Sequence, residues 1–242
     1  MIAPRPIPAP RRVTAQTADL DVVGYDMYRD IHKGIRAELF AVTWEAGTTD
    51  PGDAYAVGRI ARRAHDLAGL VAFHAGHEDE FIQPRLRRIA PALADVVAAD
   101  HPALDAAAVA AATLVERAAE GPPARRRASL HRGYLALASF TSDYLAHQAF
   151  EELEVQPALG AVMPAAELQA LDEAIVASIP PEQMATALAL MLPAMNVEDR
   201  AELLAQIRAG APPAVFDGVW GLARSVLPSD DVDVLAARLR AA

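Results

Sequence analysis

The sequence contains no cysteine. This absence excludes disulfides, iron–sulfur clusters, thiolate zinc sites and cysteine nucleophiles, so any metal ion must be held by nitrogen and oxygen ligands. Aromatic residues make up only 5% of the chain and only 13 of the 242 residues are glycine, whereas alanine is abundant. This composition favours helices, and no segment alternates apolar and polar residues as a strand does. We therefore predict an all-α fold.

Positive charge is also scarce. The formal net charge is −10 and the isoelectric point is near 5.1, which argues against nucleic acid or an anionic membrane as a partner, because a basic surface supplies the affinity for both. The most apolar run, 185–195, is short and contains Pro193, and the first residues, MIAPRPIPAPRRVTAQ, lack the apolar run of a signal peptide. We expect a soluble, cytoplasmic protein that binds small molecules, metal ions or other proteins.

Proline, glycine and capping residues divide the chain into three parts: residues 1–19, 20–160 and 161–242. Residues 1–19 are rich in proline and polar residues, which predicts a flexible N-terminal arm. Residues 20–160 predict four long helices with short connections, the pattern of an antiparallel up-down four-helix bundle. The expected helices span about 21–44, 50–87, 91–119 and 124–155, with Asp50 capping the second, Pro51 following it, and an irregularity at Pro102.

The remaining residues, 161–242, predict an all-helical C-terminal extension. Its short helices are expected to break at 180–181, 193, 210–213 and 227–228, and the segment that begins with Ser229 is expected to cap the last one. The stretch PEQMATALALMLPAM, 181–195, is amphipathic to wholly apolar, and methionines at helical spacing usually fill a core. We expect this stretch to pack either on the bundle or on a second subunit of a homodimer.

Two stretches share one pattern. HAGHEDEFIQP begins at residue 74 and HQAFEELEVQP at residue 147, and both contain histidine, three residues, glutamate, an acid and then Gln-Pro at the same offsets. Residues four apart on a helix lie on one face, so His74 and Glu78 can reach one point, as can His147 and Glu151. Two such pairs on separate helices can face one interior point of a bundle, as in dimetal carboxylate proteins.

Each pair has a histidine partner earlier in the chain. His32 lies 42 residues before His74, and His101 lies 46 residues before His147. These separations fit two helices of a hairpin that reach a similar height, given a rise of about 1.5 Å per residue. Four imidazoles and two carboxylates suit a pair of iron, manganese or zinc ions. A cation would also compensate the cost of burying two carboxylates.

The sequence from about 22 to 159 resembles the hemerythrin-like, or HHE cation-binding, family. The resemblance lies in the segments DIHKGIRAEL, HAGHEDEFIQP, DHPALD and HQAFEELEVQP. It implies an antiparallel four-helix bundle around two iron ions, or manganese, with an oxo or hydroxo bridge and with the two glutamates bridging the metals. The metal ligands that it implies are His32, His74, Glu78, His101, His147 and Glu151.

The pattern departs from that of oxygen-carrying hemerythrins, which have two histidines one turn apart on the third helix. Here the third helix offers His101 and then Asp105, and the fourth offers His147 and Glu151. Fewer imidazoles and more carboxylate favour the ferric state and leave more labile positions on iron. A reaction with the small oxidants O₂ or peroxide, or sensing of iron or oxygen, is therefore favoured over reversible oxygen carriage.

Other polar residues near the pattern have simpler explanations. His77 and Asp105 could support a ligand, but an exposed histidine beside acids and a helix-terminal acid are the commoner cases. His65 and His131 are rotated to roughly the opposite face. Three tyrosines could line the core near the metals and assist an oxidant, although plain packing is commoner. These tyrosines are Tyr25, Tyr28 and Tyr144.

Three functional classes remain open at this point. The first is a di-iron oxidoreductase that reacts with O₂ or peroxide; no organic substrate and no catalytic residue beyond the metal ligands can be named. The second is a non-catalytic iron or oxygen sensor or store whose helical extension responds to metal occupancy. The third is a metal-free helical scaffold, in which the two glutamates would be dispensable.

Overall fold

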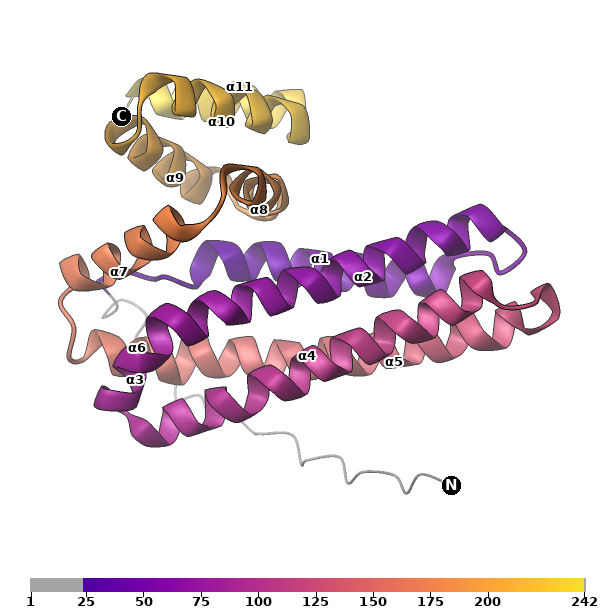
Figure 1. Cartoon of the computed structure of the whole chain (residues 1–242). Helices are drawn as coiled ribbons and strands as arrows, with labels where there is room; N and C mark the ends of the chain where they lie inside the picture. The colour runs from indigo at the N-terminus through magenta and orange to yellow at the C-terminus, as the bar shows by residue number, and fades with distance from the viewer. Residues whose placement is uncertain (1–23, 242) are drawn as a thin grey trace.

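A computed structural model describes residues 24–241, and every regular element within them is a helix. The expected N-terminal arm, 1–19, lies outside the described residues. Four long helices lie side by side, and a group of shorter helices stacks on one side of them (Figure 1). The long helices are α1 (Arg29–Thr48), α2 (Ala54–His77), α4 (Pro91–Glu120) and α5 (Pro123–Phe150). In space α1 contacts α2 and α5, and α4 contacts the same two helices.

Two helix starts differ from the sequence prediction. The first long helix begins at Arg29 rather than near residue 21, because Asp26 Oδ1 accepts hydrogen bonds of 3.0 Å from the backbone N–H groups of Tyr28 and Arg29. The second is capped by Asp53, whose side chain accepts from the backbone N–H of Ala56, and not by Asp50. Both starts are therefore set by an aspartate that accepts free amide protons of the first turn.

The expected irregularity at Pro102 is absent from the described helix α4, which is continuous from Pro91 to Glu120. Pro102 is exposed, so water can satisfy the carbonyl that its missing N–H leaves free. The third long helix of the sequence prediction is thus correct in its extent and wrong in its expected distortion.

The second and fourth predicted helices are not uniform. At the same offset in the two repeated stretches, the α-helix widens into a five-residue π-helical turn, η2 (Glu78–Ile82) and η3 (Glu151–Val155). Each turn then returns to a short α-helix, α3 (Gln83–Ile89) or α6 (Gln156–Gly160). π-Helical turns inside α-helices are rare and occur frequently at functional sites.

The repeated Gln-Pro pair stabilises these turns. The backbone N–H groups of Gln83 and Gln156 donate to the carbonyls of Glu78 and Glu151, five residues earlier. The proline that follows each glutamine has no N–H to continue the α-helical pattern. Each glutamine side chain also donates to a distant carbonyl: Gln83 to Ala94 O at 2.8 Å and Gln156 to Tyr25 O at 2.6 Å.

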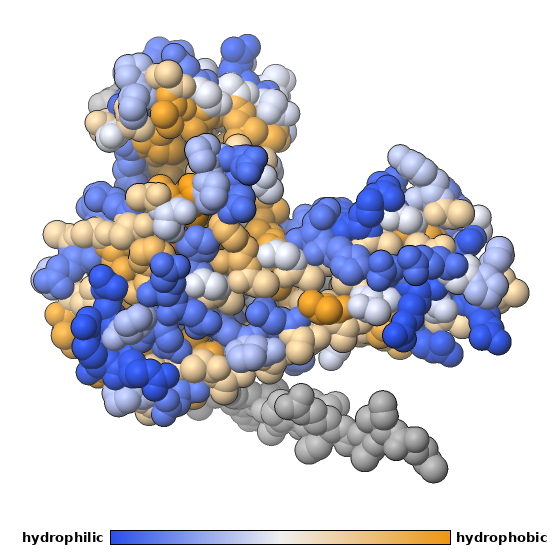
Figure 2. Space-filling model, in the orientation of Figure 1, coloured by the Kyte–Doolittle hydropathy of each residue, from blue (hydrophilic) through white to orange (hydrophobic). Residues whose placement is uncertain are grey.

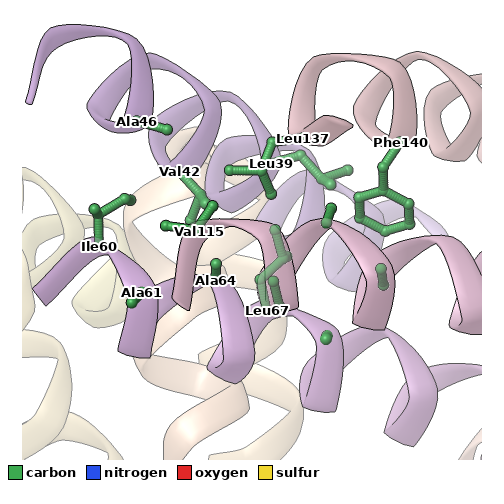
Figure 3. Packing of buried hydrophobic residues seen from close by; sticks show 14 of the residues in the cluster. Leu39, Val42, Ala46, Ile60, Ala61, Ala64, Leu67, Val115, Leu137 and Phe140 are labelled. Atoms are coloured by element: carbon green, nitrogen blue, oxygen red, sulfur yellow. The ribbon is translucent and has the colours of Figure 1, made fainter. Parts of the chain in front are cut away.

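Two apolar clusters fill the space between the long helices. The larger cluster lies along α1, α2, α4 and α5 and includes Leu39, Val42 and Leu137 (Figure 3). The second surrounds the π-helical turns and includes Ile82, Val97 and residues of helix α7 (Ala165–Ser178). Along the chain, each of the four candidate histidines separates buried residues of one cluster from buried residues of the other. The candidate site therefore lies between two apolar layers.

In the described chain, five helices follow the bundle; the last four share a core of their own, and the second of the five packs on α1. They are α7 (Ala165–Ser178), α8 (Pro181–Ala194), α9 (Val197–Gly210), α10 (Pro213–Val226) and α11 (Ser229–Ala241). The expected breaks are present except at Pro193, which lies within the last turn of α8. A Cβ atom on Gly34 of α1 would lie 3.3 Å from Leu190 and Met191, so the glycine permits close approach of α8.

Hydrophobic residues gather where these helices meet the long helices (Figure 2). In the described part of the chain, no single helix has the length and apolar character of a membrane span; α7 and α8 meet these criteria only as a pair, which is bent by 119°.

The close approach of α4 and α5 yields a prediction. A Cβ atom on the buried residue Gly133 of α5 would lie 2.7 Å from Val115 Cγ2 and 3.1 Å from the Val115 backbone in α4. We expect Gly133→Ala to destabilise the protein by about 1–3 kcal/mol, because overpacking forces the helices apart.

Gly69→Ala is the matched control, since a Cβ atom there meets nothing within 4 Å. It should stabilise the protein by about 0.5–1 kcal/mol. Urea unfolding measures both changes, and equal behaviour of the two variants would contradict the prediction.

Candidate metal centre

The structure brings all six predicted ligand residues together in two adjacent groups. One group is His32, His74, Glu78 and Glu151, and the other is Glu78, His101, His147 and Glu151. In each group the ligand atoms lie within 4.8 Å of one another. The two glutamates belong to both groups. Each group could therefore hold a metal ion.

Each shared glutamate directs one oxygen toward each group. Glu78 Oε1 lies 3.1 Å from His74 Nε2, and Glu78 Oε2 lies 3.3 Å from His101 Nε2. Glu151 repeats this arrangement, with Oε1 3.2 Å from His147 Nε2 and Oε2 3.5 Å from His32 Nε2. A carboxylate placed in this way between two sets of imidazoles is suited to bridging two cations.

Several polar atoms of these residues are buried without a hydrogen-bond partner among the described residues. They are both carboxylate oxygens of Glu78, Oε2 of Glu151, Nε2 of His101 and Nδ1 of His147. Buried polar atoms are almost always hydrogen-bonded, and a cluster of exceptions requires a specific reason. All but the His147 Nδ1 atom are ligand atoms that face the centre, so a pair of cations fits the donor set and would compensate the buried charge.

Two further acids orient the histidines, and the sequence analysis missed both. His32 Nδ1 lies 2.9 Å from Glu152 Oε1, and His101 Nδ1 lies 2.9 Å from Asp79 Oδ1. An ionised carboxylate only accepts hydrogen bonds, so Nδ1 is the donor and Nε2 faces the centre, as a metal ligand requires. The signal was present, because these are the acids that follow the glutamate in both repeated stretches.

Both of these contacts join the first helical hairpin, α1 and α2, to the second, α4 and α5, with the π-helical turns that follow them. His32 on α1 contacts Glu152 in η3, and His101 on α4 contacts Asp79 in η2. Glu152 is also held by Arg36, whose two terminal nitrogens donate to its two oxygens at 2.7 Å each. Burial would raise the pKa of Glu152, but the hydrogen bonds from His32 and Arg36 outweigh burial and lower the pKa to about 2.

The charges of the centre are strongly coupled. Burial would raise the pKa of Glu78, yet His74 and His101 hold it well below its usual value. Burial would likewise lower the pKa values of His101 and His147, but the carboxylates around them raise these values to about 11 and about 9. Without cations, these histidines therefore hold protons at neutral pH, and metal binding must displace them.

The other candidate residues lie outside both groups. The His77 Nδ1 atom contacts the backbone carbonyl of Phe73 at 2.8 Å, and Asp105 is only partly buried. His65 Nε2 lies 3.3 Å from Glu116 Oε2 at the surface, and His131 is exposed. None of the four is among the residues that the structure groups as metal ligands in the described chain.

Two of the three tyrosines flank the centre. The Tyr28 ring lies 4.9 Å from the His32 ring and the Tyr144 ring 5.8 Å from the His147 ring, measured between centroids. Both side chains are buried, and burial together with the two central carboxylates raises the pKa of each hydroxyl. Tyr25 instead donates a 2.8 Å hydrogen bond to Asp172 of α7.

The raised histidine pKa values predict how the stability of the metal-free protein depends on pH. The unfolded-state pKa of histidine is about 6.5, so the stabilisation from protonated His101 and His147 is complete below pH 6.5. It is lost as the pH rises through about 9 and about 11, the folded-state values. We expect Tm, measured by circular dichroism in chelator, to fall between pH 6.5 and 9. A constant Tm over this interval would contradict the ion pairing.

Comparison with known proteins supports the chemistry of the site. No curated protein and no solved structure matches the chain. The family model that does match describes the hemerythrin HHE cation-binding domain and spans residues 23–159, more than half of the sequence and all six residues of the two groups. The chain therefore belongs to the hemerythrin HHE cation-binding family.

Proposed function

We propose that this protein holds two non-heme iron ions and reacts with O₂ or peroxide at them. One observation supports the pair of metals above all others: the Glu78 and Glu151 carboxylates each place one oxygen at a histidine of either group. A single-metal site needs no shared carboxylates. The mixed imidazole and carboxylate donor set suits iron, and also manganese.

In this proposal His32 and His74 bind one ion, His101 and His147 bind the other, and both glutamates bridge. The four long helices then form an antiparallel up-down bundle around the pair. The short connections between consecutive long helices support this arrangement, as do the contacts that link α1, α2, α4 and α5 into a ring.

The centre favours a small oxidant as its partner. An iron pair would exchange electrons with a molecule bound between the two ions. The six ligand side chains are between 0 and 10% exposed, so they exclude bulk water and large substrates. Two surface pockets, one beside Trp44 and one beside Trp220, have none of the six proposed ligands among their lining residues.

Metal content and peroxide consumption test this proposal. We expect protein purified in air to contain about two iron ions per chain by elemental analysis and to show the visible absorption of a ferric pair. Mixing with hydrogen peroxide should deplete the peroxide much faster than an equal concentration of free iron does. Two ions of manganese would revise the metal identity; a protein that cannot be loaded with either metal would refute the proposal.

A second function, an iron or oxygen sensor or store, is favoured by where the extension docks. Lys33 and Gly34, next to the ligand His32, contact Asp199 of α9 and Met191 of α8. Arg29 on the same helix pairs with Glu202 at 3.1 Å. A shift of His32 on loss of metal would therefore displace residues that contact α8 and α9 directly. Two bound iron ions without accelerated loss of peroxide would favour this function over the first.

Both functions predict that metal stabilises the fold. A ligand at 100 times its Kd adds about 2.7 kcal/mol, and each kcal/mol moves Tm of a chain of this size by roughly 2–4 °C. We expect chelation to lower Tm by roughly 5–10 °C, as measured by calorimetry on protein whose metal removal is verified.

The paired substitution Glu78→Ala and Glu151→Ala separates these functions from a metal-free scaffold. It should abolish metal binding and the effect of the chelator on Tm, whereas a metal-free scaffold has no chelator effect to lose and should tolerate the loss of both carboxylates. A chelator effect that persists in the double variant would contradict the assignment of the bridges.

A further inference from the structure

The His32/His74 group and the His101/His147 group have similar ligand atoms but different charged neighbours. In each half a carboxylate accepts from the Nδ1 atom of a histidine, Glu152 from His32 and Asp79 from His101, both at 2.9 Å. Such outer carboxylates raise the basicity of a histidine ligand and with it the metal affinity. Any difference between the two carboxylates should therefore appear as a difference between the two metal positions.

The two outer carboxylates differ because, among the described residues, only Glu152 has an arginine partner, Arg36. Its guanidinium forms two 2.7 Å hydrogen bonds with Glu152 and so balances the negative charge behind His32. Asp79 has no such partner: among residues 24–241, no lysine or arginine lies within ion-pair distance of it. The charge that polarises His101 is therefore uncompensated by a neighbouring cation, although it is half exposed and partly screened.

The second histidine of each group shows the same trend. His147 Nδ1 lies 3.5 Å from Asp100 Oδ2, close enough for electrostatic attraction. His74 has no carboxylate other than that of Glu78 within ion-pair distance in the described chain. It is also the most exposed of the six ligands, at 10%. The group that contains His74 thus has less negative charge behind its imidazoles and more access to water.

We propose that the two metal positions are unlike: the His101/His147 position retains its ion, and the His32/His74 position, where Arg36 neutralises the outer carboxylate, is the one that exchanges metal. Arg36 and Asp79 act through the histidines and are positioning residues. This proposal rests on the dimetal centre proposed above. It gives the protein one resident ion and one ion that responds to the supply of metal.

Titration of the metal-free, full-length protein with Co²⁺ against a chromophoric chelator tests the proposal. Co²⁺ lies next to Fe²⁺ in the affinity order of divalent metals. We expect two binding steps, the first at least tenfold tighter. Asp79→Asn should weaken the first step by about 10–100-fold, the usual effect of losing an outer-shell partner, and leave the second step unchanged. Arg36→Gln should tighten the second step, and Arg36→Lys, which keeps the charge, should leave it near its original value.

Arg63→Gln is the matched control for Arg36→Gln. Arg63 also forms a two-pronged ion pair between elements, with Glu38 at 2.7 and 2.8 Å and similar exposure, but away from the ligands. It should change neither step. A melting curve of each metal-free variant verifies that it is folded.

Two equal steps in the unsubstituted protein would overturn the proposal, as would an effect of Asp79→Asn on the second step or no effect of Arg36→Gln on it. These outcomes leave the dimetal centre intact. Failure to bind two Co²⁺ ions would instead refute the dimetal centre and this proposal together.

Discussion

The burial of two carboxylates among four imidazoles is the constraint on which the rest of this structure depends. Glu78 and Glu151 are almost fully buried between two apolar clusters, where an uncompensated charge is costly. Protons on His101 and His147 compensate that charge, and bound cations would do so in their place. Every long helix contributes a histidine to the centre, so the centre fixes the heights at which the four helices pack.

The backbone around the glutamates is adapted to the same task. Backbone hydrogen bonds of a π-helical turn span five residues, whereas those of an α-helix span four. If the α-helix continued unchanged through residues 74–84, the side chains after Glu78 would therefore point in other directions than they do. The wider turn lets Glu78 face the centre while Asp79 reaches His101 on a different helix. The glutamine and proline that follow end the turn. The repeated sequence stretches therefore share a π-helical turn of the backbone as well as the same histidine and glutamate positions.

The sequence predicted the six residues that the structure brings together, because their spacing lies within single helices and hairpins, where a rise of about 1.5 Å per residue determines which side chains meet. It also predicted the helical class and most helix ends, because proline and glycine mark them. The roles of Asp79, Glu152 and Arg36 were missed because their partners are remote in the chain and depend on how the helices pack. The start of α2 was misplaced because Asp50 and Asp53 are both good caps, and only the folded turn selects Asp53.

The outer contacts have a consequence for how the protein is made. His32, His74 and Glu78 leave the ribosome early, but the carboxylate that orients His32 belongs to Glu152. At about 5–20 residues per second, roughly 4–15 s pass between the synthesis of Glu78 and that of Glu152. During this interval the first hairpin has ligands but no complete site. A complete two-metal site would therefore form only after the second hairpin is made, so the two hairpins would have to fold together before the site could bind its ions.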